Sequence, residues 1–350
     1  MLNLAPSYDA LVAGFRWNIP ARLNMAVQVC EARAEADPDR LAILDLSRGR
    51  EEITFADLAL MVRQVQAALE AREVKAGDRV GVLLSQSALC AAAHIACWRM
   101  GAISVPLFKL FREEALRSRL GDSGARVVVT DDDGVVMLAP FDVVAVTEQD
   151  LGVATGLAPA ETGPETPAVL IYTSGTTGTP KGALHGHRVL TGHLPGVEVS
   201  HDFLGRDGDV IWTPADWAWI GGLFDVLMPG LALGVPVVAC RMPRFDVATC
   251  LSVIREGAVR NVFFPPTALR MLKAEGVRID GLRSVASGGE PLGAEMLAWG
   301  RDAFGVAINE FYGQTECNMV ASSCGALFDA RPGCIGKAVP GSDGPVRAPA

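Results

Sequence analysis

Residues 168–186 read AVLIYTSGTTGTPKGALHG, an apolar run followed by a loop of Ser, Thr, Gly and Pro around Lys181. The apolar run predicts a buried strand, which is typical of parallel sheets covered by helices on both faces. A Gly/Ser/Thr loop directly after such a strand can turn successive backbone NH groups toward an anion, and a lysine adds a point charge. We therefore predict a phosphate-binding loop.

The spacing within this loop excludes two familiar phosphate-binding motifs. If a Walker loop began at Gly175, its second glycine would fall on Pro180 and its Ser/Thr on Gly182. The dinucleotide pattern GxGxxG also fails, because no glycine lies between Gly175 and Gly178. A plain linker is a poor alternative, since the proline stiffens the loop and a lysine is costly for a spacer.

Short apolar runs alternate with helical patterns along most of the chain. Thr54 and Asp57 predict a capped amphipathic helix, and the stretch after it continues as strand, helix, strand. Such alternation predicts an α/β fold with parallel sheets covered on both faces. The strands are too many for one sheet of usual size, so we expect two doubly wound, mostly parallel sheets packed with helices.

Composition restricts the partners of the protein. Of its 350 residues, 50% are hydrophobic and 20% charged, and the formal net charge is −9. The charges form no basic stripe, which argues against nucleic acid as a partner. The longest charge-free run, 80–98, contains Ser, Gln and His residues, so we predict a buried strand and helix and no transmembrane segment.

The cysteines and the N-terminus bear on the cellular compartment in which we expect the protein. Eight cysteines show no CxxC pair and no zinc-type spacing, which favours a reducing, cytoplasmic environment. The first 20 residues lack the basic and apolar regions of a signal peptide. For the acidic run 131–133 we expect a solvated turn. Four histidines lie in and after the loop without matching metal-ligand offsets, so we expect helix-surface or capping roles for them: His185, His187, His193 and His201.

Five motifs in order resemble one enzyme family. The chain resembles the adenylate-forming acyl-CoA synthetases (AMP-dependent synthetases and ligases) over roughly residues 20–340. The motifs that carry the resemblance are YTSGTTGTPKG (172–182), TPADWAWIGG (213–222), FFPPTALRML (263–272), SGGEPL (287–292) and YGQTE (312–316). The resemblance implies an acid–thiol ligase that joins a carboxylic acid to ATP, releases pyrophosphate, and passes the acyl group from AMP to coenzyme A.

The resemblance also implies roles for single residues. The loop would wrap the β- and γ-phosphates of ATP, with Thr173 and Lys181 among its catalytic residues; the other loop residues are Ser174, Gly175, Thr176, Thr177 and Gly178. The adenine pocket would be lined by Gly289, Glu290, Pro291, Tyr312, Gly313 and Gln314, with Tyr312 stacked on the purine. Thr315 would bond the α-phosphate, and Glu316 would ligate Mg²⁺.

The tryptophan-rich motif bears on the acyl group. Trp217, Trp219 and Gly221 resemble one wall of an acyl pocket, although a core aromatic cluster is the alternative. Acetate-restricted members of the family carry tryptophan where this chain has Gly313. We therefore expect a deeper slot for short- or medium-chain acyl groups or aryl acids, and acetate as the only substrate is disfavoured.

By resemblance, residues 1–330 form the large N-terminal ATP- and acyl-binding domain. Its approximate subdomains are 55–205, and 20–54 together with 206–330, while 331–350 is a loose Gly/Pro-rich tail. The family's small C-terminal domain, which acts as a lid and brings a further lysine, is missing from this chain. We therefore expect the 350-residue chain to keep a nucleotide pocket and to be severely impaired in adenylation.

Two alternatives stay open. One is a non-catalytic homologue that binds a nucleotide or an acyl-AMP. The other is a different adenylate-forming ligase, for example one that loads a carrier protein. Because absent segments would leave apolar surface uncovered, we also expect a homo-oligomer as one state of the chain.

Overall fold

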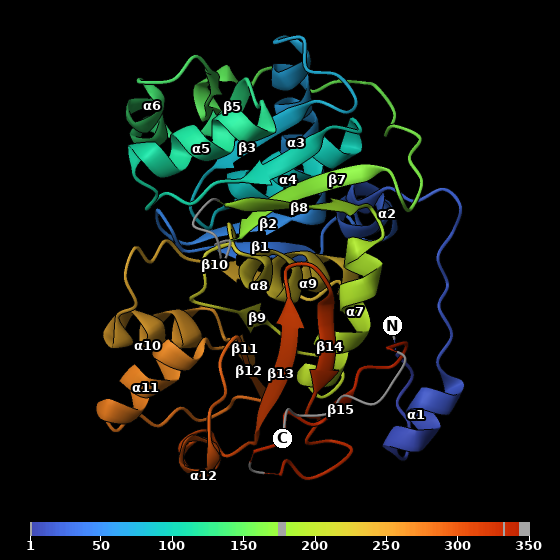
Figure 1. Cartoon of the computed structure of the whole chain (residues 1–350), viewed down its shortest axis with the longest axis vertical. Coiled ribbons are helices and arrows are strands. Elements are labelled where there is room, and N and C mark those ends of the chain that lie inside the picture. The colour runs from blue at the N-terminus through green and yellow to red at the C-terminus, as the bar shows by residue number, and fades with distance from the viewer. Residues whose placement is uncertain (1, 174–179, 332, 343–350) are drawn as a thin grey trace.

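Two sheets stacked one above the other form the frame of the molecule (Figure 1). The computed structural model describes residues 2–173, 180–331 and 333–342. The expected α/β fold with two mostly parallel sheets is confirmed. The nine-stranded sheet has, in spatial order, the strands β15 (Lys337–Ala338), β14 (Asn318–Ser322), β13 (Ile308–Gln314), β12 (Ser284–Gly288), β11 (Asn261–Phe263), β9 (Ile211–Trp212), β10 (Val237–Ala239), β1 (Leu41–Asp45) and β2 (Glu51–Thr54).

The six-stranded sheet comes from one continuous stretch of the chain, inserted between β2 and β9. Its strands in spatial order are β6 (Val144–Val146), β5 (Val127–Thr130), β3 (Arg79–Leu83), β4 (Ile103–Pro106), β7 (Pro167–Thr173) and β8 (Lys181–Gly186). All neighbours in it are parallel except β7 and β8. In the nine-stranded sheet the antiparallel pairs lie toward the edges: β1 with β2, β13 with β14, and β14 with β15.

Helices cover both sheets. Around the six-stranded sheet lie α3 (Phe55–Glu70), α4 (Ala88–Arg99), α5 (Glu113–Ser123), α6 (Asp132–Leu138) and the 3₁₀ turn η2 (Glu148–Asp150). The remaining helical elements are α1 (Tyr8–Gly14), η1 (Val27–Glu31), α2 (Ala32–Ala36), α7 (Val189–Ser200), α8 (Ile220–Gly222), η3 (Leu223–Leu227), α9 (Met228–Leu233), α10 (Val247–Glu256), α11 (Pro266–Ala274) and α12 (Ala294–Phe304). Both η1 and η3 are π-helical turns.

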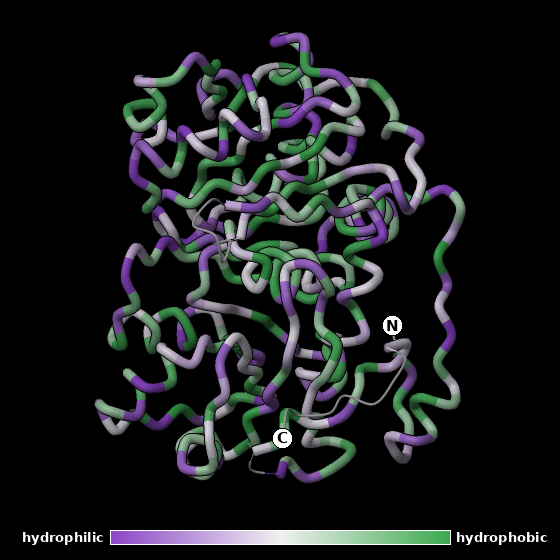
Figure 2. Tube along the Cα trace, viewed as in Figure 1, coloured by the Kyte–Doolittle hydropathy of each residue, from purple (hydrophilic) through white to green (hydrophobic). Residues whose placement is uncertain are grey.

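One hydrophobic core joins the two sheets. Strand β3, helix α4 and the α8–η3–α9 segment all contribute to the same buried cluster. Figure 2 shows that segment as a mainly hydrophobic centre of the molecule. Because α4 lies in the middle of this cluster, all its residues except Leu89 are buried, which explains its continuous apolar sequence.

The predicted cap at Thr54 is confirmed. The Thr54 hydroxyl accepts from the NH of Asp57, and the Asp57 carboxylate accepts from the NH of Thr54, each at 3.1 Å. Asp therefore replaces the usual Glu of a capping box. The cap fixes the start of α3 directly after β2.

Three stretches differ from what the sequence predicted. Residues 181–186 form β8 and return along β7, because the loop before them reverses the chain. The acidic run 131–133 is not a plain turn: Asp131 caps α6 and pairs with Lys109. In the tail predicted to be loose, Lys337–Ala338 pair with β14 as β15, since that edge offers unpaired backbone groups.

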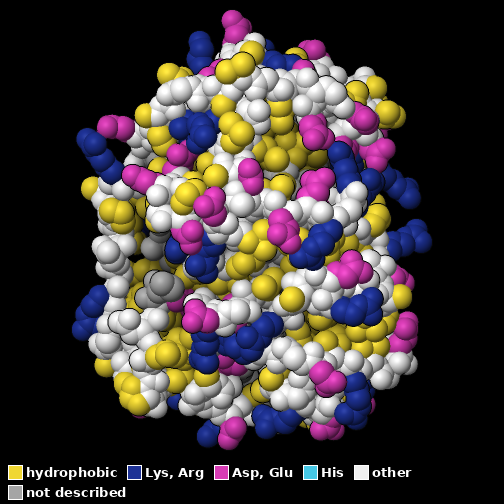
Figure 3. Space-filling view, turned by 180° about the vertical axis from the view of Figure 1, so that it is seen from behind, with side chains coloured by type: hydrophobic (Ala, Val, Ile, Leu, Met, Phe, Trp, Pro, Cys, Tyr) yellow, Lys and Arg dark blue, Asp and Glu magenta, His cyan; other side chains and the backbone are white. Residues whose placement is uncertain are grey.

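The surface carries charges of both signs side by side. In the view from behind, Lys and Arg side chains alternate with Asp and Glu side chains across the whole face (Figure 3). Helices long and apolar enough to span a bilayer do not occur in the described residues. All eight cysteines are free thiols; Cys317 and Cys334 are exposed and the rest are buried.

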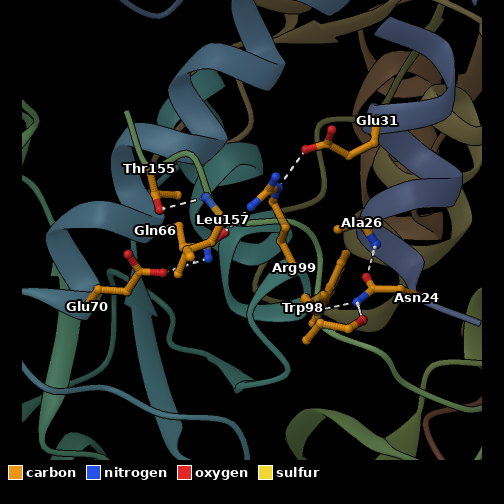
Figure 4. Close-up of polar contacts among 10 residues, drawn as sticks. Asn24, Ala26, Glu31, Gln66, Glu70, Trp98, Arg99, Thr155 and Leu157 are labelled. Carbon is orange, nitrogen blue, oxygen red and sulfur yellow. Dashed lines mark hydrogen bonds and ion pairs between the residues drawn. The ribbon is translucent and has the colours of Figure 1, made fainter. Parts of the chain in front are cut away.

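A buried polar network ties α4 to its neighbours (Figure 4). The Arg99 side chain, at the end of α4, donates to Glu31 at 2.6 Å and to Gln66 at 2.7 Å. Gln66 in turn donates to Glu70 at 2.8 Å. Asn24 donates to the carbonyl of Trp98 at 2.9 Å. The network connects η1, α3 and α4, which are far apart in sequence.

Candidate functional site

The segments predicted to bind adenine meet at one edge of the nine-stranded sheet. Gly288, the last residue of β12, pairs with Phe311 of the parallel strand β13. The residues after β12 are exposed, and Gly289 has a φ of +102°, a conformation that favours glycine. Tyr312 on β13 is 40% exposed, so its ring can be reached by a ligand. Carboxyl ends of parallel strands are where open α/β sheets bind their ligands.

Glu290 and Pro291 are exposed beside Gly289 on this segment. Glu290 forms an exposed ion pair with Arg270 of α11 at 3.0 Å. The 289–291 segment continues directly from β12, and this pair ties it to α11. Of this segment, Gly289 lines a cavity together with Gly313.

A tight turn carries the residues predicted to contact the α-phosphate and the metal. Residues 315–317 join β13 to β14, and Cys317 donates its NH to the carbonyl of Gln314 at 3.2 Å. Thr315 and Glu316 therefore project from the end of the sheet, where Figure 1 shows the turn reaching up to α8 and α9. Glu316 is exposed.

The predicted phosphate loop connects β7 to β8. Thr173 ends β7 and Lys181 begins β8; they are register partners, and the Thr173 hydroxyl lies 3.5 Å from the Lys181 carbonyl. Lys181 is exposed. The other predicted loop residues, Ser174, Gly175, Thr176, Thr177 and Gly178, lie outside the described residues.

His185 links the hairpin to the turn. It lines a cavity of about 490 Å³ together with Glu316 and Asn318. Burial lowers the pKa of His185, and His193 adds to this effect, while the backbone of Thr315 and the Glu316 carboxylate oppose it. Of the predicted site residues, Glu316 lines this cavity, whereas Lys181 of β8 and Thr315 of the turn do not.

A second cavity, of about 230 Å³, lies behind this turn. Gly221, Gly289, Gly313, Gln314 and Thr315 line it, so five of the predicted site residues share one space. A Cβ atom added at Gly313 would meet the Asn318 carbonyl oxygen at 2.5 Å. Glycine is therefore required there by the close approach of β14, and a larger side chain would have to displace that strand.

The two tryptophans of the predicted acyl wall lie in different environments. Trp219 is 47% exposed and lines a larger cavity of about 720 Å³ together with Gly221, Lys109 and Arg241. Trp217, in contrast, is fully buried in the core and does not line that cavity. The prediction for Trp217 as a pocket wall was wrong, because its ring fills the space between the two sheets.

The predicted helix-surface role was wrong for three of the histidines, which are buried, whereas the predicted capping role fits His187, which bonds Met25 at the start of a helical segment. His187 is fully buried, and its Nδ1 accepts from the NH of Met25 at 3.0 Å. His201 is buried with its Nδ1 2.9 Å from the Ser284 hydroxyl. Burial lowers the pKa of His187 to about 4 and that of His201 to about 3. His193 is buried on α7, and its Nδ1 lies 2.9 Å from Asp225.

The fit of Mg²⁺ to this site depends on its donors. Groups of three or more His, Cys, Asp or Glu side chains that could hold a metal do not occur among the described residues. Mg²⁺ characteristically takes one or two carboxylates, with phosphate oxygens and water as the other ligands. An exposed carboxylate at Glu316, beside the predicted phosphate position, fits that requirement.

Sequence reasoning missed several residues of the site. Asn318 lines both smaller cavities and has a φ of +63°, which is unusual for a non-glycine residue. Asp216 lines the largest cavity, and burial raises its pKa to about 6. Asp225 was hidden inside an apolar helical pattern. Only the buried charge in that pattern could have revealed it.

Comparisons with known proteins agree with this geometry. The family model described as AMP-binding enzyme matches residues 30–347. The acetyl-coenzyme A synthetase of Penicillium chrysogenum is 30% identical over 91% of this chain, which covers 54% of that relative. The acetyl-coenzyme A synthetase of Halorhodospira halophila is 31% identical over 93% of this chain, which covers 58% of that relative. The chain thus spans little more than half the length of these relatives.

Solved structures show the same fold. An acyl-CoA synthetase from Brucella canis superposes with a TM-score of 0.86 and 28% identity, covering 96% of this chain and 67% of that one. The anthranilate CoA ligase AuaEII, in complex with anthranoyl-AMP, superposes with a TM-score of 0.82 and 26% identity, covering 92% of this chain and 66% of that one. The match extends over both sheets.

Proposed function

Because the chain belongs to the AMP-binding enzyme family, we propose that it binds ATP and a carboxylic acid and takes part in forming an acyl-adenylate and then an acyl-CoA. The observation that carries the proposal is the meeting of separate motifs around one space. The end of β12, the end of β13 and the turn after it, and α8 all contribute residues to one cavity.

In the proposed first step, a carboxylate oxygen bonds to the α-phosphorus of ATP. The bond from that phosphorus to the oxygen bridging the β-phosphate breaks, and pyrophosphate leaves. Lys181, at the start of β8, provides a positive charge for the leaving phosphates. Thr315, on the turn after β13, provides hydrogen-bonding groups at the α-phosphate. The exposed ring of Tyr312 stacks on the adenine.

Mg²⁺, when held by Glu316 and the phosphates, would neutralise part of the phosphate charge. In the second proposed step the thiol of coenzyme A attacks the acyl carbon, a thioester forms, and AMP leaves. The residues of this chain contribute by binding and orienting the acyl-adenylate. Lys109 and Arg241 line the cavity of about 720 Å³, where they pair with Asp131 and Asp133.

For the acyl group we propose a short- or medium-chain or aryl acid rather than acetate alone. The cavity of about 230 Å³ supports this, since a cavity of about 150 Å³ already holds benzene. Ile220, Phe263, Phe311 and Met319 give it a mainly apolar lining. Glycine at 313 leaves this space open to the acyl chain.

ATP binding by the 350-residue chain tests the proposal, measured by calorimetry with and without Mg²⁺. We expect Lys181→Ala to weaken ATP binding roughly 10- to 100-fold, the loss of one charge-assisted contact. Glu316→Gln should remove most of the dependence on Mg²⁺. The control is Lys75→Ala, an exposed lysine in the loop after α3. Absence of ATP binding in the unsubstituted chain would refute the proposal.

The rival function, a non-catalytic nucleotide- or acyl-AMP-binding protein, makes the same binding prediction. The two separate on catalysis, measured as exchange of labelled pyrophosphate into ATP in the presence of a bound acid. Because the chain alone is expected to be severely impaired in adenylation, the exchange is also measured with a C-terminal domain of the family supplied. Exchange with any acid supports the ligase, whereas tight ATP binding without exchange even when that domain is supplied supports the binding protein.

A further inference from the structure

Two cavities of the proposed site adjoin each other: the acyl cavity of about 230 Å³ and the cavity of about 490 Å³, the outer cavity. In the turn after β13, Thr315 lines the acyl cavity and Glu316 lines the outer one. On α7, Gly192 lines the outer cavity and His193 lines the acyl cavity. Consecutive Cα atoms are about 3.8 Å apart, so at both segments the two cavities are about one residue apart.

Asn318 lies in the wall between these cavities. Within the described part of the chain, it is the one residue that lines both of them. It begins β14, and a Cβ atom added at Gly192 of α7 would meet its Nδ2 at 2.2 Å. The amide therefore lies directly against the backbone of the helix. The side chain spans the distance from strand to helix at the place where the cavities come closest.

The backbone at Asn318 has a conformation that suits glycine. Its φ is +63°, in the left-handed region, which glycine adopts freely and asparagine tolerates at a cost. A residue without a side chain would satisfy this turn at least as well. A strained position that keeps a side chain in the wall of a site points to a function for that side chain.

The outer cavity offers apolar surface beyond the wall. Three large hydrophobic side chains line it and are 43%, 38% and 55% exposed: Trp17, Ile19 and Leu184. Two of its charged side chains, Glu165 and Arg188, pair with each other at 2.7 Å. An acyl chain that passed the wall would therefore cover exposed apolar groups.

We infer that the Asn318 side chain is a partition that limits the length of the acyl group, and that its removal joins the acyl cavity to the outer cavity. This inference rests on the proposed function, since it assigns a specificity-determining residue to the same site. A cavity of about 150 Å³ holds the six carbons of benzene, so about 230 Å³ holds an acyl group of about six to nine carbons. The partition excludes longer chains.

The expected magnitudes follow from the burial of methylene groups. Up to the limit, each methylene removed from water should tighten binding roughly 4-fold. Beyond it, the chain must displace the Asn318 side chain, so affinity should stop rising and fall roughly 10-fold. In Asn318→Gly the rise should continue for at least about two further methylenes, a gain of roughly 10-fold for those chains.

The test measures binding of sulfamoyl-adenosine analogues of acyl-AMP to the 350-residue chain by calorimetry. The analogues carry straight acyl chains with even numbers of carbons from two to fourteen. The unsubstituted chain should show a break in affinity near the limit. Asn318→Gly should move the break to longer chains and leave the affinity for the four-carbon analogue unchanged. Because glycine suits the left-handed backbone at this position, the variant should keep its melting temperature.

Two further variants separate a partition from a general effect. Cys317→Ala changes the neighbouring residue, which lines the outer cavity but not the acyl cavity, and should leave the break unchanged. Trp17→Ala removes apolar surface from the outer cavity. It should weaken binding of the long chains in the Asn318→Gly background and have no effect on any length in the unsubstituted background.

If the break stays at the same length in Asn318→Gly, this inference is overturned while the proposed function stands. The same holds if the unsubstituted chain shows no break, or if Trp17→Ala weakens binding of the long chains equally in both backgrounds. If neither ATP nor any analogue binds, the proposed function fails, and this inference fails with it.

Discussion

Arg99 is expected to be one of the most costly positions to change in this protein. Its side chain is 4% exposed and donates to Glu31 and to Gln66, at 2.6 and 2.7 Å. Arg99→Met keeps the apolar stem and removes the guanidinium. Both acceptors then lose their donor, and the Gln66 oxygen is left buried.

The magnitude follows from these contacts. Removing one partner of a buried ion pair costs about 3–5 kcal/mol. The Glu31 side chain is 23% exposed and can regain some water, so we expect the lower half of that range, about 3–4 kcal/mol. This is a large part of the net stability of a typical domain, about 5–15 kcal/mol.

Urea unfolding, followed by circular dichroism, measures the change. The matched control is Arg117→Met, because the Arg117–Glu113 pair is 58% and 59% exposed and should contribute less than about 1 kcal/mol. Adding Glu31→Gln to Arg99→Met should recover part of the loss, since it removes the uncompensated charge. A loss below about 1 kcal/mol for Arg99→Met would contradict the reasoning.

Three further predictions concern pH and the site. Burial raises the pKa of Asp216 to about 6, whereas the same group in the unfolded chain titrates near 4. The contribution of Asp216 to stability is therefore lost as pH rises through 6. Asp216→Asn should stabilise the protein by roughly 3 kcal/mol at pH 7.5, seen as a higher melting temperature, but not at pH 4. Burial lowers the pKa of three histidines to between about 3 and 4, so their contribution to stability is fully present above pH 6.5 and is lost as pH falls toward those values: His94, His187 and His201. By pH 5 each should have cost about 2 kcal/mol of stability, a loss that calorimetric melting from pH 7 to 5 would register. A melting temperature constant over that range would contradict this. Gly313→Trp must displace β14, so we expect a lower melting temperature and weaker binding of ring-sized acids; an unchanged affinity in the calorimetric assay would count against the assigned cavity.

The sequence predicted the fold class well because the apolar runs are continuous. Strands such as β3 and β5 are buried on both faces, so nearly all of their residues are apolar and form continuous runs in the sequence. Strand β8 was missed because none of its residues, KGALHG, is buried and they show no apolar run. Its position depends on pairing with β7 rather than on its own sequence.

The site could be predicted only in part. Motifs at the ends of strands, such as the one around Tyr312, can be recognised in the sequence because their turn residues and their predicted ligand-binding residues are adjacent. Trp217 and Trp219 are two residues apart in one motif, yet one fills the core and the other faces a cavity. The His193–Asp225 pair joins residues from α7 and η3, so only the packing of these two elements brings it together.

The insertion of the six-stranded sheet has a consequence for synthesis. Its strands come from 79–186, so they can pair once this stretch has left the ribosome, but the core that α4 shares with α8, η3 and α9 is completed only when residues 220–233 follow. The hairpin of β1 and β2 emerges earlier, but its parallel neighbour β10 is made much later. Until β10 has been made, the edge of β1 is unpaired and can bind a wrong strand. The strands of the six-stranded sheet can pair during this time.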